Sequence, residues 1–373
     1  MSEHKKVLNW PDIGRKLGIE QSWLLTDVAA KIGNRPIHAV YIGGSLAEGY
    51  GNVRSDVDVY VLLDESSRPL WRGGFEISVV NSHTLQYVFV SVEQLDAAIL
   101  QFENRPFENA SVSRSLNQIL HRLVHSVVVH GDVIVQSYRL RLKAARYSEF
   151  SSFVKEMQCE NSLVDAYGAW EAGQYETATY NLRLAAIRAF EAVLSLYGQT
   201  ATNEKWVFEK AVSALGRKHS VYENFVDLYR KMPPSFSSED VKEYFDNLLA
   251  FIQLCFDATT ANVLVPHPTY EQVSNLTQAI LKRNFFSLRR QKNSRIHIKR
   301  YKNSNLVFQA AIPKRELSDR AALVWLCLGI TPTLTESVEM ARHSRPDLFL
   351  DVNNVELAKK LEAAWVKTGM LVG

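Results

Sequence analysis

The middle of this 373-residue chain is dominated by one pattern, in which apolar side chains recur every three to four positions from about residue 140 to residue 264. This spacing puts apolar side chains on one face of a helix. Gly198 and the Pro233-Pro234 pair interrupt the pattern, because glycine and proline end helices. The pattern predicts helices near 149–173, 175–197, 204–215 and 237–258. We therefore expect a helical bundle over residues 139–281, with different folds before and after it.

The first part of the chain, residues 1–138, alternates between strand and helix patterns. A helical pattern near 20–32 ends at Gly33, and another begins at Val92. Between and around them, short β-branched and aromatic runs predict strands at 37–42, 57–63, 75–80 and 85–92.

The last part, residues 282–373, changes pattern again. Short apolar runs predict strands at 285–288, 295–299 and 305–309. Helices are expected near 317–328, 333–342 and 354–368, the first of them capped by Ser318.

Composition indicates a soluble globular protein, with 46% hydrophobic and 22% charged residues and a net charge of only +3. Three scattered cysteines, Cys159, Cys255 and Cys327, have no metal-ligand spacing and suit a reducing compartment. The amino terminus shows no signal-peptide pattern, and no uninterrupted apolar run reaches the ~18 residues that a membrane span needs. We expect a cytoplasmic protein with no membrane partner.

A glycine-rich turn, Gly43-Gly44-Ser45, follows the first predicted strand and precedes a short predicted helix. Glycine lets backbone N–H groups approach a phosphate closely, and a helix amino terminus favours negative charge. The Ser45 hydroxyl would add a donor. Gly44 and Ser45 are therefore candidates for binding a nucleotide.

Two acids, Asp56 and Asp58, follow at the next predicted strand. Side chains alternate across a strand, so residues two apart project from the same face. Paired carboxylates suit a hard cation such as Mg²⁺, which binds one or two carboxylates together with substrate phosphates. Either half of this pattern alone is usually a turn or a solvated strand; the combination in this order predicts a metal-and-phosphate site.

The stretch resembles the signature of the polymerase-β-like nucleotidyltransferase superfamily. The residues that carry the resemblance are Gly44, Ser45, Gly49, Ser55, Asp56 and Asp58. The resemblance implies a mixed sheet with flanking helices, and transfer of a nucleoside monophosphate from a nucleoside triphosphate with release of pyrophosphate. It implies Asp56 and Asp58 as catalytic metal ligands, Mg²⁺ or Mn²⁺ as the metal, and ATP as the expected donor.

The sequence departs from the superfamily at a third carboxylate, commonly found on a later strand ahead of a Ser-x-Glu-x-Leu helix start. Residues 91–95 match that helix start, but the preceding strand has Gln86 or Val88 at the expected position. Glu76, on the neighbouring strand, is a possible third carboxylate; the alternative is an ordinary exposed glutamate. A base from the helical bundle is equally compatible with the sequence.

Superfamily members that modify small molecules often have a helical bundle that closes over the nucleotide, and residues 180–191 with 203–206 resemble that arrangement. Lys205, at the start of a predicted helix, is a candidate to contact the triphosphate and neutralise the leaving pyrophosphate. The alternative is an exposed Lys205 beside a core Trp206.

The carboxyl-terminal part begins with a basic run, since residues 282–303 contain nine Lys or Arg and no Asp or Glu. Such a run is typical of a nucleic-acid surface or of a solvated β-face. Strands followed by three helices also resemble the PqqD-like winged-helix domain, or RiPP recognition element. That resemblance implies capture of a precursor-peptide leader as an added strand.

Together these features predict an α+β chain with three parts: a nucleotidyltransferase domain, a helical bundle that closes its cleft, and a winged-helix-like β/α domain. The expected activity is nucleotidyl transfer to an acceptor, with a ribosomally made precursor peptide as the first candidate. One alternative is a small hydroxylated acceptor of the aminoglycoside type. The other is a degenerate transferase that binds nucleotide, peptide or nucleic acid without turnover.

Overall fold

The computed structural model describes residues 9–371 except for short gaps. The gaps are at 34, 53, 68–74, 105–113, 203, 266–272, 284–291, 294, 302–303, 310–311 and 351. The chain divides into two compact units, Met1–Tyr147 and Ser148–Gly373, and each is described by itself. Residues 139–147 of the predicted bundle belong to the first unit, and the rest of the bundle lies with the predicted carboxyl-terminal domain in the second unit.

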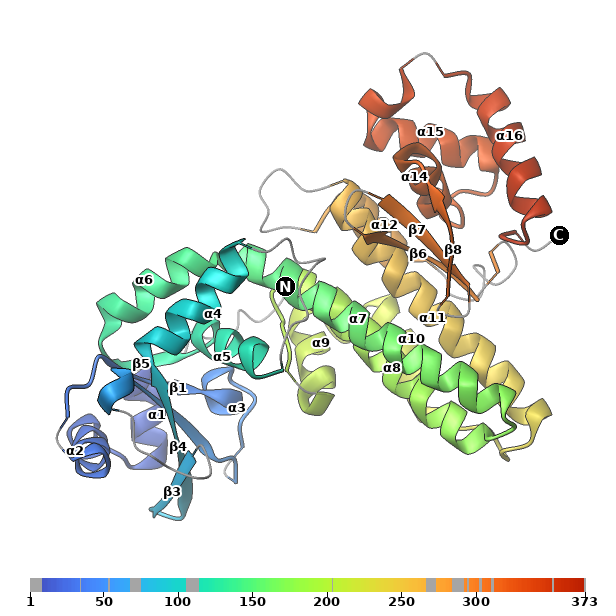
Figure 1. The fold of residues 1–373 in the computed structure, drawn as a ribbon. Coiled ribbons are helices and arrows are strands. Elements are labelled where there is room, and N and C mark those ends of the chain that lie inside the picture. The colour runs from blue at the N-terminus through green and yellow to red at the C-terminus, as the bar shows by residue number, and fades with distance from the viewer. Residues whose placement is uncertain are drawn as a thin grey trace. The chain divides into compact units, whose positions relative to one another are not determined.

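The first unit is built on a five-stranded mixed sheet with the strand order β3-β4-β2-β1-β5. Figure 1 shows this sheet with its flanking helices. Its strands are β1 (Ala39–Gly43), β2 (Val57–Leu63), β3 (Phe75–Val80), β4 (His83–Ser91) and β5 (Val127–His130). Strands β2 and β4 are parallel, and the other neighbours are antiparallel. All four predicted strands are present, and β5 is an addition that the sequence pattern did not indicate.

Helices cover both faces of this sheet. They are α1 (Trp10–Leu17), α2 (Gln21–Ile32), the single turn α3 (Gly44–Ala47), η1 (Glu65–Ser67), α4 (Val92–Asn104), α5 (Arg114–Val124) and α6 (Asp132–Leu142). Helices α1 and α2 share a core with one face, where Val40, Val59 and Tyr87 are fully buried. The other face carries Tyr41 stacked on Tyr60, with ring centroids 5.3 Å apart.

The second unit begins with helices. They are α7 (Ala144–Glu171, which starts in the first unit), α8 (Tyr175–Leu196), η3 (Glu204–Trp206), α9 (Val207–Leu215), α10 (Ser220–Arg230), α11 (Ser238–Leu264) and α12 (Asn275–Leu281). An antiparallel sheet of order β6-β7-β8 follows, made of β6 (Ile296–Tyr301), β7 (Ser304–Gln309) and β8 (Ile312–Leu317). The chain continues through α14 (Asp319–Cys327), α15 (Leu334–Ser344), η4 (Pro346–Phe349) and α16 (Asn354–Lys367).

Most predicted elements of the second unit are present. Ser318 caps α14 by accepting a hydrogen bond from the Ala321 N–H, as expected. Thr333 and Glu336 form a reciprocal capping box at the start of α15. The predictions missed α10, α12 and β8, and the predicted strand at 285–288 lies outside the described residues.

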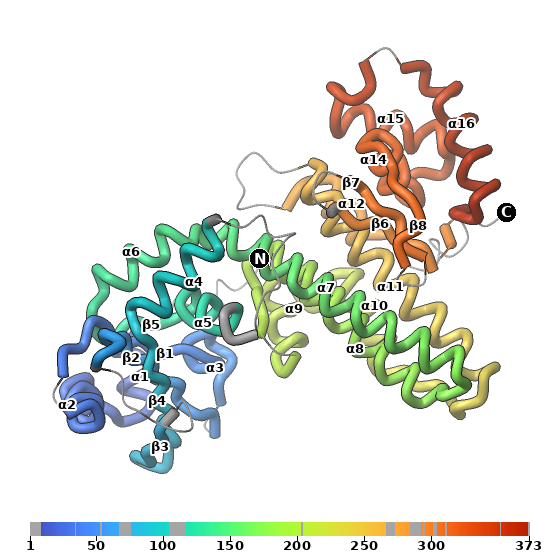
Figure 2. The backbone as a smooth tube through the Cα atoms, in the orientation of Figure 1, coloured from blue at the N-terminus to red at the C-terminus, as the bar shows by residue number. Residues whose placement is uncertain are grey.

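Helix α11 is the central helix of the second unit and runs alongside α8 (Figure 2). By length and composition it is apolar enough to cross a membrane, yet 83% of its most apolar window is buried inside the protein. It also contacts β6 and α14. The bundle and the carboxyl-terminal elements therefore share one continuous apolar core.

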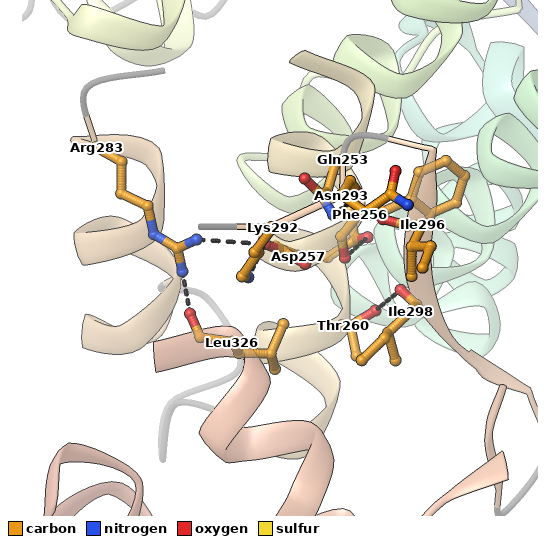
Figure 3. Close-up of polar contacts among 11 residues, drawn as sticks. Gln253, Phe256, Asp257, Thr260, Arg283, Lys292, Asn293, Ile296, Ile298 and Leu326 are labelled. Atoms are coloured by element: carbon orange, nitrogen blue, oxygen red, sulfur yellow. Dashed lines mark hydrogen bonds and ion pairs between the residues drawn. The ribbon is translucent and has the colours of Figure 1, made fainter. Parts of the chain in front are cut away.

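A buried ion cluster on α11 reinforces that connection (Figure 3). The Asp257 carboxylate accepts a hydrogen bond from Lys292 Nζ at 2.8 Å and pairs with Arg283 Nη1 at 3.3 Å. Arg283 also donates to the Leu326 carbonyl at the end of α14. The three charged side chains are essentially inaccessible to solvent, and burial lowers the pKa of Lys292 to about 8.

The same cluster changes the interpretation of the basic run. Arg283 and Lys292 pair with Asp257, Lys299 pairs with Glu160 at 3.0 Å, and Arg300 pairs with Asp319. Four of the nine basic residues are therefore ion-paired within this unit and do not form a solvated β-face. Three others, Arg289, Arg290 and Lys302, lie outside the described residues.

We expect Asp257→Asn to lower the free energy of unfolding by about 3–5 kcal/mol, because it leaves two buried cations without a counter-charge. Denaturant unfolding followed by circular dichroism would measure the loss. The matched control is Asp227→Asn, which removes an exposed pair with Lys231 and should cost less than about 0.5 kcal/mol. Equal losses in the two variants would contradict a stabilising role for the cluster.

Candidate functional site

The predicted glycine turn lies at the end of β1, where the chain enters the single helical turn α3. Gly44 has φ = +77°, a left-handed conformation that favours glycine. The Ser45 carbonyl then accepts hydrogen bonds from the N–H groups of Tyr50 and Gly51, both at 2.8 Å. Because α3 has only one turn, phosphate binding here would rely on the N–H groups of the turn and on the Ser45 hydroxyl.

Asp58 lies directly against this turn. The antiparallel register of β1 and β2 pairs Gly43 with Asp58. A Cβ atom added to Gly44 would lie 2.0 Å from Asp58 Oδ2, so any larger residue there would force the carboxylate out of this position. The Asp58 side chain remains 22% exposed. The structure thus brings Gly44 and Asp58 together.

Asp56 lies in the segment that leads into β2, which begins one residue later at Val57. Its side chain is exposed. A turn immediately before it is closed by the Asn52 N–H, which donates to Ser55 Oγ at 2.9 Å, and by the Ser55 N–H, which donates to the Asn52 carbonyl at 3.0 Å. Of the two predicted acids, Asp58 alone lies within the strand.

The neighbouring strand supplies a neutral amide where the superfamily pattern has a third carboxylate. In the parallel register of β2 and β4, Gln86 pairs with Asp58 and Val88 pairs with Tyr60. Gln86 is therefore the direct lateral neighbour of Asp58 on the same face of the sheet.

Glu76 lies on the opposite face. It pairs with Tyr87 across β3 and β4, and Tyr87 is paired with Val59, whose side chain points away from that of Asp58. Its carboxylate accepts a hydrogen bond from Lys31 Nζ at 3.0 Å, on the side of the sheet that α2 covers. The structure does not bring Glu76 to Asp58, and its sheet position is unsuited to a shared metal.

Sequence reasoning missed a second set of charged residues at the turn. Arg122, on α5, places Nη2 3.6 Å from Asp58 Oδ2 and Nη1 3.4 Å from Glu48 Oε1. His121 Nε2 lies 3.0 Å from the same Glu48 oxygen. Burial raises the pKa of the nearby Tyr60, and the Arg122 cation opposes that rise. The sequence shows only adjacent His and Arg on a helix, with no signal that links them to the turn.

Lys205 belongs to the second unit and lies on η3. It is exposed, and its Nζ lies 5.1 Å from the centre of the Trp206 ring, which is itself only partly buried. Trp206 is therefore not the fully buried core residue of the alternative interpretation.

The donor set at the turn fits Mg²⁺ only if the substrate completes it. Among the described residues, no group of three or more His, Cys, Asp or Glu side chains is arranged to hold a metal ion. Magnesium is commonly held by one or two carboxylates together with substrate phosphates and water. Asp58 beside the Gly44 turn supplies one such carboxylate, and Asp56 lies two residues earlier in the chain, just before β2.

Comparisons with known proteins add little to this geometry. No protein-family profile matches the chain, and no curated protein matches it. A solved structure, a nucleotidyltransferase-like protein from Exiguobacterium sibiricum 255-15, is similar with a TM-score of 0.39 and 14% identity. The match covers 77% of this chain and 97% of that one. A similarity this low carries no argument about function, which therefore depends on the residues of the site.

We expect Gly44→Ala to destabilise the first unit more than Gly33→Ala, the matched control. Both glycines have positive φ, but a Cβ at Gly33 meets nothing within 4 Å, whereas one at Gly44 meets the Asp58 carboxylate. The backbone strain should cost about 1–2 kcal/mol in each variant, and the clash about 1–3 kcal/mol more in Gly44→Ala. Thermal and denaturant unfolding would measure both, and equal losses would contradict the close contact.

Proposed function

We propose that this chain is a metal-dependent nucleotidyltransferase that moves a nucleoside monophosphate from a nucleoside triphosphate, by default ATP, to an acceptor. The observation that supports this most directly is the Asp58 carboxylate lying against the left-handed Gly44 turn. The proposed cation ligand and the proposed phosphate-binding turn are thereby adjacent, as transfer of a phosphate-bound group requires.

In the proposed reaction an acceptor oxygen forms a bond to the α-phosphorus, and the bond from that phosphorus to the bridging oxygen of the β-phosphate breaks. Pyrophosphate leaves, and the acceptor proton passes to a base that we do not assign. Asp56 and Asp58 would hold Mg²⁺ or Mn²⁺, which when bound neutralises charge on the phosphate oxygens. The N–H groups of the Gly44–Ser45 turn and the Ser45 hydroxyl would orient the triphosphate.

For the acceptor we propose a ribosomally made peptide that pairs with the edge strand β8. Within the described part of the chain this strand has one neighbour, β7, and its residues from Ile312 to Glu316 are exposed. Pro313 has no N–H group, so pairing would use the part from Lys314 to Leu317. The exposed cations Lys314 and Arg315 would favour an acidic segment. The setting that we propose for this chemistry is the cytoplasm.

A second candidate is a degenerate transferase that binds nucleotide without turnover. The observation that favours it is Gln86, a neutral residue beside Asp58 on the same face of the sheet. An amide can supply an oxygen ligand but cannot accept the acceptor proton as a carboxylate can. Turnover therefore distinguishes the two candidates.

We expect label from α-³²P-ATP to appear on an acceptor in the presence of Mg²⁺. Asp56→Asn and Asp58→Asn should each lower transfer at least about a hundredfold, because each removes a metal-binding charge. The matched control is Asp64→Asn, just beyond the end of the same strand, where the aspartate pairs with His38 at 2.8 Å. It should retain most of the activity. Tight ATP binding with no transfer to peptide, small-molecule or nucleic-acid acceptors would instead favour the degenerate candidate.

The variant Glu76→Gln tests, in the same assay, whether a carboxylate on the α2 side of the sheet takes part in transfer. Because Glu76 faces α2 and lies away from Asp58, this variant should keep the rate of transfer within about threefold of the wild-type rate. A loss as large as that of Asp58→Asn would show that Glu76 acts as the third carboxylate after all.

We expect charge reversal of Lys314 and Arg315 to weaken binding of an acidic peptide at least about tenfold. The probe is the fluorescently labelled peptide product of a reading frame beside this gene, followed by fluorescence anisotropy. Charge reversal of Arg230 and Lys231, exposed on and just after α10, is the control. Binding to random-sequence DNA with a steep salt dependence, and no binding to the peptide, would contradict a peptide acceptor.

A further inference from the structure

The guanidinium of Arg122 is packed directly on the glycine turn. A Cβ added to Gly43 would lie 3.0 Å from Arg122 Cδ, and one added to Gly44 would lie 3.4 Å from Nη1. From there the two terminal nitrogens reach Glu48 at 3.4 Å and Asp58 at 3.6 Å. One cation therefore lies between the carboxylate of the turn and the carboxylate proposed to bind metal.

The surroundings hold this cation in place. The Arg122 side chain is only 13% exposed, and Glu48 and His121 behind it are 7% and 1% exposed. Glu48 immediately follows α3, so the group that anchors Arg122 belongs to the same turn that is proposed to bind phosphate. Arg122 belongs to α5 but is held against the turn by these contacts, and it is not an exposed surface cation.

A divalent cation on Asp58 would lie within a few ångströms of this guanidinium. Two like charges at such a distance repel strongly where solvent access is limited. In addition, the positive charge of Arg122 already offsets the negative charge that would attract the metal. A triphosphate changes this balance, because its negative charges attract the metal and the guanidinium together.

We propose that Arg122 is a positioning residue that makes metal loading depend on nucleotide. In this scheme, which rests on the proposed function, the site binds the metal–nucleotide complex well and the free metal poorly. Arg122 weakens the attraction of Asp58 for a bare divalent cation and contributes to the attraction for the phosphates that accompany it. The ligand class that the site selects is therefore a divalent metal complex of a nucleoside triphosphate.

Mn²⁺ binding followed by electron paramagnetic resonance tests this without relying on turnover. In the absence of nucleotide, Arg122→Gln should raise the affinity for free Mn²⁺ at least about tenfold. With the non-hydrolysable donor α,β-methylene-ATP present, the same variant should bind the Mn²⁺–nucleotide complex at least about tenfold more weakly. Arg122→Lys, which keeps the charge, should leave the affinity for free Mn²⁺ low.

Two controls accompany these variants. Arg15→Gln removes the same charge from an exposed position on α1 and should change neither affinity. Arg122→Met also removes the charge but keeps the packing of the side-chain stem against Gly43. It replaces Arg122→Gln if that variant shows no thermal unfolding transition and so does not fold.

The outcomes separate the two proposals. Asp58→Asn should abolish Mn²⁺ binding with and without nucleotide; if it does not, the metal site itself is wrong and both proposals fail. If Asp58→Asn abolishes binding but the charge-removing variants of Arg122 behave like Arg15→Gln, or bind free Mn²⁺ more weakly than the wild type, only the role of Arg122 is overturned.

Discussion

The site depends on the register between two neighbouring strands. Pairing of Gly43 with Asp58 places a carboxylate beside the first residue of the turn that follows β1. Because side chains alternate along a strand, a shift by one residue would turn Asp58 to the opposite face, where α1 and α2 are packed. Six of the seven β2 residues are buried, and Val57, Val59 and Val61 lie in the core beneath α1 and α2; a shift would bury the Asp58 carboxylate there, which disfavours any other register.

The sequence was sufficient for those parts of the site that depend on local pattern. A strand that ends in glycine and a second strand with an acid near its start predicted the proximity of Gly44 and Asp58. Whether Gln86 or Val88 lies beside Asp58 depends on the register between β2 and β4, which no local sequence pattern specifies. Glu76 was misplaced for the same reason, since its face follows from the register between β3 and β4.

Tertiary contacts account for the rest. Arg122 lies 64 positions from Asp58 in the chain, and its role at the turn follows only from the packing of α5 on the sheet. The basic run was likewise misleading, because the acids that pair with it come from other segments. Lys299 meets Glu160 of α7, and Lys292 meets Asp257 of α11. A charge pattern along the chain shows which residues can ionise but not which of them find partners.

The Asp257 cluster also limits how the protein can be dissected. Arg283 and Lys292 lie on the carboxyl-terminal side of the boundary at which the sequence suggested a separate domain, while their counter-ion lies in the middle of α11. A fragment that ends at residue 281 would retain a carboxylate in an apolar helix with both of its cations removed, and would uncover the surface on which Trp325 packs. The carboxyl-terminal elements are therefore part of the folding unit of the bundle.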